Sequence, residues 1–399
     1  MYRLYCRIFQ ICMRIGCYFL PWRKPEMLEG IHSLQHLSGI LKKHNIQSVL
    51  VVSGQNVSKS GLMEPMLLEL KRDGIKVYLY DKTVPNPTVD NIKEAKMMYI
   101  ANDCNGIIAF GGGSSIDCGK GVAALVARPG KTMAQMKGLL KVRKKTPFFV
   151  AVPTTAGSGS EATLAAVISN PATHEKYAIN DLVLIPDLAV LDPVTTVGLP
   201  KHITSITGMD ALTHAIEAYI GKSNTRETKR MAILATKLIF ENIYLAYSKG
   251  EDLTARANMQ KASFCAGIAF TRAYVGYVHG IAHSLGGFYG TPHGLANSVV
   301  LPYVLEAYGK PAYKKLAQLA DEVKLTLETD TRQEKARKFI KAIRQLNASM
   351  EIPDKIEGID SKDIPAMVEH AYLESNPLYP VPRIMNRKEL ALIYDAIRK

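Results

Sequence analysis

The sequence predicts two successive domains of different class: an α/β domain built on a doubly wound parallel sheet, followed by an all-helical domain. Short β-branched runs alternate with helical apolar spacing up to about residue 200, and glycine-rich turns follow two of these runs. Beyond that point, long helical periodicities dominate. The chain has 399 residues, more than one hydrophobic core usually spans, so its length also favours two domains.

The first domain is predicted from strands and helices that follow one another in turn. The predicted strands are "SVLVV" (48–52), "KVYLYD" (76–81), "GIIAFGGG" (106–113) and "PFFVAVPTT" (147–155). Helical spacing covers 27–45, 62–74 and 89–103. Because a helix carries the chain back before the next strand begins, this alternation implies a parallel sheet with a helix between successive strands.

The second domain is predicted from five long helical stretches, at 207–221, 226–248, 252–272, 311–325 and 331–347. This pattern begins after "LDPVTTVGLP" (191–200), which places a domain boundary near residue 200. We therefore expect an amphipathic N-terminal helix at 1–24, the α/β domain at 25–200 and the helical domain at 201–399.

The N-terminal stretch "MYRLYCRIFQICMRIGCYFLPWRK" predicts an amphipathic helix that ends near Pro21. At 100° per residue, Arg3, Arg7 and Arg14 lie within about 40° of one another, and they interrupt the apolar run of a signal peptide. We expect this helix to pack on its own protein or on a sister subunit. The alternative is shallow membrane association through the arginine face. We expect no membrane-spanning helix.

The composition is that of a soluble globular protein, with 47% hydrophobic and 22% charged residues and a net charge of +14. The positive charge favours anionic cofactors, nucleic acid or a membrane surface. No nucleic-acid motif accompanies it, so we expect no nucleic-acid partner. Six cysteines without a CxxC pair suggest no disulfide framework, and a cytoplasmic location is the simplest expectation.

Two glycine-rich turns form a candidate phosphate site. "AFGGGSSIDCGK" (109–120) follows a predicted strand and begins a helix, so its backbone N–H groups can contact an anion. It is not a P-loop, because Gly121 stands where that motif needs Ser or Thr. "PTTAGSGSE" (153–161) follows the next strand. Together they predict a dinucleotide or phosphate ligand at the carboxyl edge of the sheet; the alternative is two purely structural turns.

Two further segments predict a metal centre. "GYVHGIAHSLGGFYGTPHG" (276–294) contains His279, His283 and His293. In "GMDALTHAIEAY" (208–219), Asp210 and His214 are four residues apart and share one helix face. Mixed nitrogen and oxygen ligands suit Fe²⁺ or Zn²⁺, and such an ion lowers the pKa of a bound hydroxyl. Ordinary hydrogen-bonded histidines and a salt-bridged or helix-capping aspartate are the alternatives.

In this order and spacing, the glycine-rich loop and the two metal-site segments resemble those of the iron-containing (group III) alcohol dehydrogenases. The resemblance runs from about residue 25 to about 390 and includes "VPNPT", "IPDLAVLDP" and "LPYV". It implies the dehydroquinate synthase-like fold: an NAD(P)-binding α/β domain, a helical domain and one metal in the cleft between them. Fe²⁺ is the family's metal, and the same ligands accept Zn²⁺.

The resemblance also assigns roles by motif position. The metal ligands would be Asp210, His214, His279 and His293. His283 resembles the family's non-ligand histidine near nicotinamide and substrate, a candidate catalytic proton relay.

The cofactor residues are assigned in the same way. The pyrophosphate loop of the family resembles Gly112, Gly113 and Ser114, with Asp117 in its supporting turn. The second cofactor loop resembles Thr154, Thr155 and Ser158. Lys176 resembles the lysine that reaches the ribose.

One departure bears on the choice of cofactor. Many NAD-preferring members end the first strand with an aspartate that binds the adenosine ribose, and here "LVVSGQNV" places Gly54 at that point. A carboxylate there would repel a 2′-phosphate. Its absence, with Ser53, Ser58 and Lys59 nearby, favours NADP(H) over NAD(H).

The expected reaction is metal-assisted hydride transfer between an uncharged small-to-medium alcohol or aldehyde and the nicotinamide. The aromatic residues expected to line the site are Phe264, Phe270, Tyr274, Phe288 and Tyr289. A phosphorylated-polyol dehydrogenase or a dehydroquinate-synthase-like lyase is the nearest alternative and would need a basic clamp. The more remote alternative is a non-catalytic, membrane-attached nucleotide-binding protein. The resemblance further implies a homodimer or larger assembly.

Overall fold

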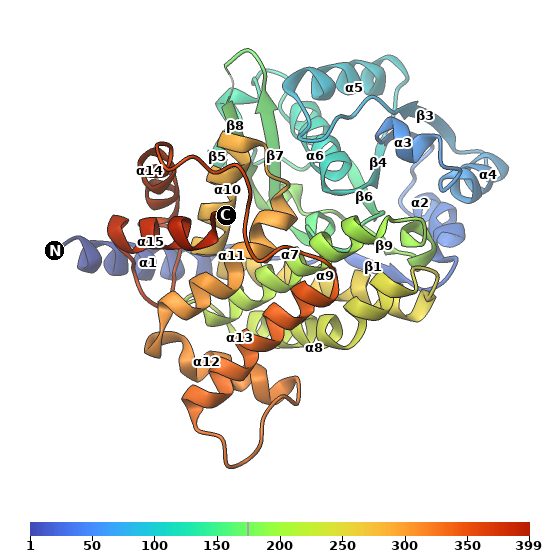
Figure 1. Ribbon diagram of the computed structural model, residues 1–399. Helices are drawn as coiled ribbons and strands as arrows, with labels where there is room; N and C mark the ends of the chain where they lie inside the picture. Colours follow the sequence, from blue (N-terminus) through green and yellow to red (C-terminus); the bar gives the residue numbers. More distant parts are fainter. Residues whose placement is uncertain (174) are drawn as a thin grey trace. The chain divides into compact units, whose positions relative to one another are not determined.

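A computed structural model describes residues 1–173 and 175–399 (Figure 1). Their contacts divide the chain into two compact units. The sheet unit comprises Pro21–Leu199 and Glu251–Gln260, and the helical unit comprises Met1–Leu20, Pro200–Gly250 and Lys261–Lys399. The chain therefore passes from one unit to the other at residue 200. Residues 1–20 precede that position but belong to the helical unit, and residues 251–260 follow it but belong to the sheet unit.

The sheet unit is built on a six-stranded sheet in the order β1-β9-β6-β4-β2-β3, in which every pairing is parallel. Its strands are β1 (Glu26–Glu29), β2 (Ser48–Val52), β3 (Lys76–Tyr80), β4 (Gly106–Gly111), β6 (Phe148–Pro153) and β9 (Leu188–Leu191). Because all strands are parallel, their carboxyl ends share one edge. The four strands expected from the sequence are all present.

Helices cover both faces of this sheet, as the doubly wound prediction requires. They are α2 (Leu37–Lys43), the short α3 (Gln55–Ser58), α4 (Glu64–Arg72), α5 (Val89–Ala101) and α6 (Gly113–Ala127). Alternate residues of β2 enter two separate cores: Leu50 packs with residues of α5 and α6, and Val49 with residues of α2 and α4. Period-two alternation between two buried faces explains why β2 is apolar throughout.

Two features of the sheet unit differ from the sequence-based expectation. Helical spacing was expected from residue 27, but β1 pairs with β9 at the edge of the sheet and helix begins only with a short 3₁₀ turn at Ser33–His36. A four-residue edge strand is set by its partner rather than by local pattern. A second, three-stranded sheet was not expected. It contains β5 (Gly138–Leu139), β7 (Ala165–Asn170) and β8 (Glu175–Asn180).

The helical unit is formed almost entirely by long helices. They are α7 (Lys201–Ile220), α8 (Arg226–Ser248), α9 (Leu253–Ala273, of which the part after Gln260 belongs to this unit), α10 (Tyr277–Tyr289), α11 (His293–Tyr308), α12 (Lys310–Glu322), α13 (Arg332–Ser349), α14 (Ile364–Ser375) and α15 (Arg387–Ile397). Thr225 and Thr331 form capping boxes that begin α8 and α13. Within this unit α7 packs against α8 and α11, and α10 packs against α11 and α14.

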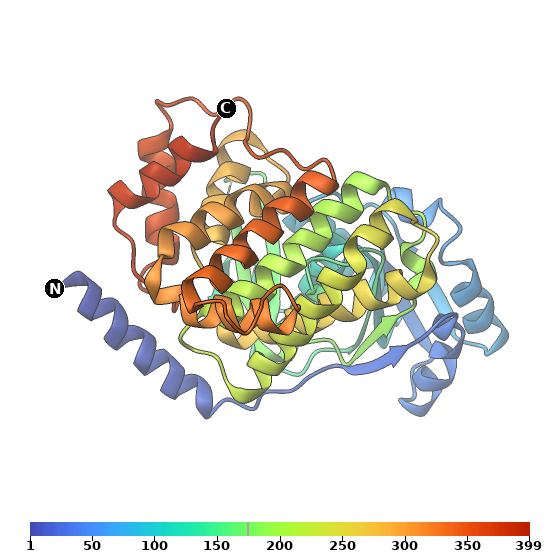
Figure 2. The same ribbon diagram turned by 60° about the horizontal axis from the view of Figure 1, so that its bottom comes forward.

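The N-terminal helix α1 (Tyr2–Tyr18) lies along the helical unit, as Figure 2 shows. Gln10 donates to the carbonyls of Pro377 (2.9 Å) and Tyr379 (2.8 Å), and Arg7 donates to that of Val381 (2.8 Å). The polar side of α1 therefore faces its own chain. The apolar side is exposed, through Leu4, Ile8, Ile11 and Ile15. No described helix combines the length and hydropathy needed to cross a membrane.

Candidate active site

Three helices of the helical unit bring four potential metal ligands together. Asp210 and His214 lie on one face of α7, His279 lies in the first turn of α10, and His293 begins α11. One donor atom from each side chain lies within 4.8 Å of the other three. Asp210, His214 and His279 are buried, whereas the side chain of His293 is 40% exposed. The four residues that the sequence assigned as ligands therefore form one cluster.

The spacing of these donors fits a single metal ion. His293 Nε2 lies 3.5 Å from Asp210 Oδ1, and His279 Nε2 lies 4.0 Å from the same oxygen. A tetrahedral site with bonds of about 2.0–2.2 Å places its donors about 3.4 Å apart. Three imidazoles and one carboxylate suit Fe²⁺ or Zn²⁺, so the donor set and the geometry agree.

The electrostatics of His279 also suit ligation. Burial lowers the pKa of this imidazole well below its usual value, and the neighbouring histidines His214, His293 and His283 lower it further. A neutral imidazole keeps a lone pair for a metal, whereas an imidazolium has none.

Two buried polar residues beside the cluster were not expected from the sequence. Glu217 Oε2 lies 2.6 Å from His279 Nδ1. Asn297 donates from Nδ2 to Asp210 Oδ1 at 2.6 Å, and the same nitrogen lies 3.1 Å from His293 Nε2. Spacing could have revealed both, because Glu217 is seven residues after Asp210 on α7 and Asn297 is four after His293 on α11.

His283 lies beside the cluster, outside the group of four donors. Its ring stacks on that of His293 with centroids 5.2 Å apart, and its side chain is 43% exposed. Its Nδ1 lies 2.6 Å from Glu374 Oε1, which also accepts from the Tyr379 hydroxyl at 2.8 Å. Burial alone would raise the pKa of Glu374, but the contact with His283 and the Tyr379 hydroxyl bring it below its usual value. A carboxylate thus holds one ring nitrogen of His283.

One of the five aromatic residues expected to line the site stacks on the cluster. The ring of Phe270 lies on that of His214, with centroids 4.1 Å apart. Tyr274 instead contacts Cys17 of α1, at 3.5 Å, and the Tyr289 hydroxyl donates to Asp363 at 2.6 Å. Phe264 is buried, and Phe288 packs edge-on against His370.

In the sheet unit, the two glycine-rich loops lie side by side. They follow the neighbouring strands β4 and β6, and Thr154 N–H donates to the carbonyl of Gly111 at 3.0 Å. A Cβ on Gly113 would lie 2.8 Å from Ser158 Oγ, and one on Gly112 would lie 3.4 Å from Thr155 Cγ2. Gly112 is the N-cap of α6, so the first N–H groups of that helix point towards this junction. The arrangement suits a pyrophosphate.

The remaining residues assigned to the cofactor surround this junction. Ser114 Oγ accepts from Asn86 N–H at 3.2 Å, and Lys176 Nζ donates to Asn86 Oδ1 at 2.7 Å. Asn86, from the "VPNPT" segment, therefore links the pyrophosphate loop to β8. Asp117 is partly buried and accepts from Val167 N–H at 3.1 Å, and desolvation raises its pKa to about 6. Asp117 thus anchors α6 to the second sheet.

Gly54 lies two residues after the end of β2 and is the N-cap of the short helix α3. A Cβ there would lie 3.2 Å from the carbonyl oxygen of Thr83. The expected contribution of Ser53 to a phosphate site is wrong, because this fully buried side chain donates to the carbonyl of Phe110 at 2.7 Å. Ser58 donates to Asp81 Oδ2 at 2.8 Å.

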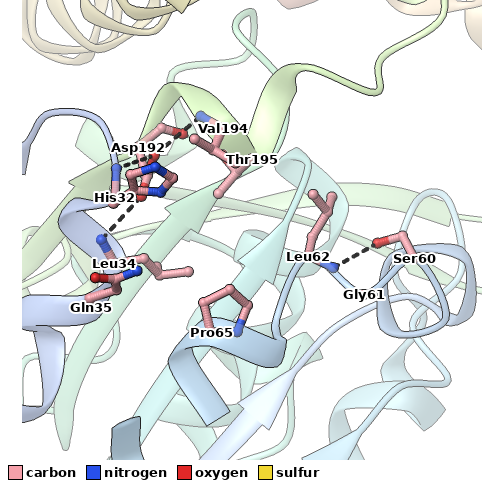
Figure 3. Close-up of a pocket in the computed structure, with 10 residues that line it drawn as sticks. All are labelled: His32, Leu34, Gln35, Ser60, Gly61, Leu62, Pro65, Asp192, Val194 and Thr195. Atoms are coloured by element: carbon pink, nitrogen blue, oxygen red, sulfur yellow. Dashed lines mark hydrogen bonds between the residues drawn. The ribbon is translucent and has the colours of Figure 1, made fainter. Parts of the chain in front are cut away.

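A separate cavity of about 260 Å³ lies in the sheet unit (Figure 3). Asp192 on its wall accepts from the backbone N–H groups of His32 (3.2 Å), Leu34 (3.2 Å) and Val194 (3.1 Å). This carboxylate therefore joins the segment after β1 to the segment after β9. We assign this cavity no part in the chemistry.

Family models match both parts of the chain. Residues 25–193 match "Iron-containing alcohol dehydrogenase", and residues 204–398 match "Fe-containing alcohol dehydrogenase family, C-terminal". Together they cover well over half of the sequence.

Individual relatives are similar over most of their length. Alcohol dehydrogenase 4 of Schizosaccharomyces pombe is 36% identical over 374 residues, covering 92% of this chain and 87% of that protein. The 1,3-propanediol dehydrogenase of Klebsiella pneumoniae is 37% identical over 343 residues, covering 86% and 88% respectively. A crystal structure of 1,3-propanediol oxidoreductase, 34% identical, superposes with a TM-score of 0.90 over 94% of this chain and 99% of that one.

The relatives do not share one cofactor. One is named NAD-dependent methanol dehydrogenase (Bacillus methanolicus, 34% identical over 90% of this chain and 95% of that protein). Another is named NADPH-dependent butanol dehydrogenase (Clostridium saccharobutylicum, 32% identical over 93% and 96%). The matches over both units, together with the clustered donors, show that this chain belongs to the iron-containing alcohol dehydrogenase family and is a metal-dependent, NAD(P)-linked alcohol dehydrogenase.

Proposed function

We propose that this enzyme is an Fe²⁺-dependent alcohol dehydrogenase and aldehyde reductase that prefers NADP(H) and acts on small-to-medium uncharged alcohols. The observation that carries the proposal is the cluster of Asp210, His214, His279 and His293, whose donor atoms lie within 4.8 Å of one another. Iron rather than zinc is proposed because the matching family models are named for iron and the nitrogen and oxygen donors accept it.

A divalent metal at this cluster would act as a Lewis acid and make an alcohol hydroxyl more acidic. The chain itself would supply orientation and proton transfer. Glu374 holds Nδ1 of His283, so Nε2 is the atom at which His283 would exchange the substrate's proton. Because this side chain is 43% exposed, it can pass that proton on to solvent. The two glycine-rich loops would hold the dinucleotide, which carries the hydride.

The preference for NADP(H) is supported by the absence of a carboxylate at Gly54. The exposed Lys59 is the nearby cation suited to a 2′-phosphate, since the Ser58 hydroxyl is already donated to Asp81. Asp81 is the opposing feature, because its carboxylate would repel that phosphate. Phe270 on the His214 ring supports an uncharged substrate over a phosphorylated one.

The test is oxidation of NADPH and of NADH by anaerobic, Fe²⁺-loaded protein with a panel of short and medium aldehydes, beside a metal-stripped sample. We expect metal-dependent turnover that is faster with NADPH. Faster turnover with NADH would overturn the cofactor preference alone. Equal activity after Zn²⁺ loading would overturn the preference for iron. Absence of turnover despite bound metal and nucleotide would favour the phosphorylated-polyol or lyase alternative.

We also propose a homodimer or larger assembly in the cytoplasm, with no nucleic-acid partner. The exposed apolar residues of α1 are available for a subunit contact. No disulfide joins the six cysteines in the described part of the chain, and disulfides are rare in a reducing compartment. Sedimentation equilibrium would give the assembly mass, and a monomer at all concentrations would contradict the assembly. Co-sedimentation with vesicles, comparing the full chain with a chain that starts at residue 25, would test for membrane contact.

A further inference from the structure

We propose that Glu217 is a positioning residue of the metal centre, which fixes the tautomer and the ring orientation of His279. This inference rests on the proposed metal binding at Asp210, His214, His279 and His293. Glu217 is buried on α7, 3% exposed, and its Oε2 lies 2.6 Å from Nδ1 of His279.

The contact determines which nitrogen of His279 faces the other donors. A carboxylate can only accept, so the Nδ1 atom opposite it carries the proton and donates. The lone pair of the ring is then on Nε2, which lies 4.0 Å from Asp210 Oδ1. Histidines that bind metals commonly donate their other nitrogen to a carboxylate, which orients the ring and raises its basicity.

The carboxylate of Glu217 also holds the backbone around its target. Gly276 N–H donates to Oε2 at 2.8 Å, and Val278 N–H donates to Oε1 at 2.9 Å. These are N–H groups at the N-terminal end of α10, where no helical carbonyl can accept them and where an anion is favoured. Glu217 therefore attaches the start of α10 to α7, two residues before His279.

Gly276 shows how closely the carboxylate approaches the backbone. A Cβ on this residue would lie 2.6 Å from Glu217 Oε1, a distance that real Cβ atoms do not reach. Only glycine fits, and the carboxylate could not move away without losing its N–H donors. The sequence "GYVH" thus combines a glycine that admits Glu217 with the histidine that Glu217 orients.

Residues on one face of α7 would thereby supply or orient three of the four metal ligands. Asp210, His214 and Glu217 are spaced i, i+4 and i+7 on α7, so their side chains share one face. The first two are donors themselves, and the third orients a donor from another helix.

The test compares metal affinity in wild type and Glu217→Gln, by anaerobic competition of Fe²⁺, and of Zn²⁺, against a chromogenic chelator. The glutamine keeps the size but turns an NH₂ group towards one of the three donors. We expect affinity to fall about 10–100-fold, as for other outer ligand partners. The metal-free variant should still fold but melt below wild type, because one buried donor loses its acceptor, and this loss of stability is measured separately from metal affinity. An unchanged affinity would overturn the proposal, whereas a wild type that binds no metal would instead overturn the proposed function.

Glu374→Gln is the matched control, because Glu374 makes the same 2.6 Å contact to His283, one turn further along α10. We expect its metal affinity to stay within about twofold of wild type. An equal loss in both variants would overturn the specific role of Glu217. Should Glu217→Gln not fold, ¹⁵N chemical shifts of the histidines in Zn²⁺-loaded wild type give the tautomers directly. A proton on Nδ1 of His279 is expected, and one on Nε2 would overturn the proposal.

Discussion

The candidate metal centre and the candidate nucleotide site use opposite means of recognition. The metal centre consists of side chains from three helices, three of its four donor residues are buried, and further side chains such as Glu217 and Asn297 contact them. The nucleotide site consists of backbone at the ends of two parallel strands. There Gly112 and Gly113 matter because they lack side chains that would occupy the space.

This difference explains why the residues of the metal centre indicate their ligand more specifically than those of the nucleotide site do. In a site made of side chains, the residue types indicate which ligand binds, since imidazole and carboxylate suit only some metals. A site of backbone N–H groups recognises an anion of any origin. In the proposed function, the distinction between NAD and NADP therefore depends on a few residues at the periphery, namely Gly54, Lys59 and Asp81.

The largest effect should come from removing a metal donor. His214→Ala should abolish metal binding and lower aldehyde reduction by at least about 1,000-fold, because the Lewis acid is lost. Metal content by elemental analysis and steady-state kinetics would measure both. His202→Ala, an exposed change on the same helix, is the control. If His214→Ala kept its metal, the cluster would not be the metal site.

The partly buried Asp117 should make the stability of the protein depend on pH. Burial raises its folded pKa to about 6, above an ordinary value of 3.8. Asp117 therefore holds its proton more tightly in the folded protein than in the unfolded chain, and its contribution to wild-type stability falls as pH rises from about 4 to 6. Asp117→Asn lacks this loss. Its stability relative to wild type should rise across that window by at most about 3 kcal/mol and then level off.

Chemical denaturation at a series of pH values would measure this change. The exposed Asp90→Asn is the control and should show no such rise. A difference between Asp117→Asn and wild type that stays constant from pH 4 to 7 would contradict the assigned cause.

A smaller effect is expected where backbone is crowded by a new side chain. Gly113→Ala places a Cβ 2.8 Å from Ser158 Oγ, so one loop must move. We expect the KM for the dinucleotide to rise roughly 10–50-fold while metal content stays unchanged. Adding Ser158→Ala should recover part of the loss, because it removes the closest atom. Gly130→Ala, which meets nothing within 4 Å, is the control. A loss of metal would mean that the two sites are not independent.

The smallest effect concerns the periphery of the nucleotide site. Gly54→Asp should shift the ratio of kcat/KM values about 10-fold from NADPH towards NADH, through repulsion of the 2′-phosphate. Asp81→Asn should shift it in the opposite direction. The two ratios, measured with one aldehyde, give the result. If neither change moved the ratio, recognition of the ribose would lie elsewhere.

Local sequence patterns predicted the strands of the nucleotide site and helix α7 of the metal site, but not α10 and α11, which carry His279 and His293. The apolar runs of β2, β4 and β6 and the long helix α7 were expected because each is defined by its own periodicity. Asp210 with His214, and the glycines after β4, could be identified because each motif lies within one element. The amphipathic character of α1 was likewise visible in the positions of its arginines.

The tertiary structure decided what depends on partners distant in sequence. In it, β1 pairs with β9, the polar side of α1 packs against residues 377–382, and Ser53 donates to the carbonyl of Phe110. Glu217 meets His279 across 62 positions of sequence, and Asn297 meets Asp210 across 87. Periodicity describes one element at a time. Residue types therefore indicated candidate donors and the family resemblance selected four of them, whereas packing between helices selected the residues that hold them.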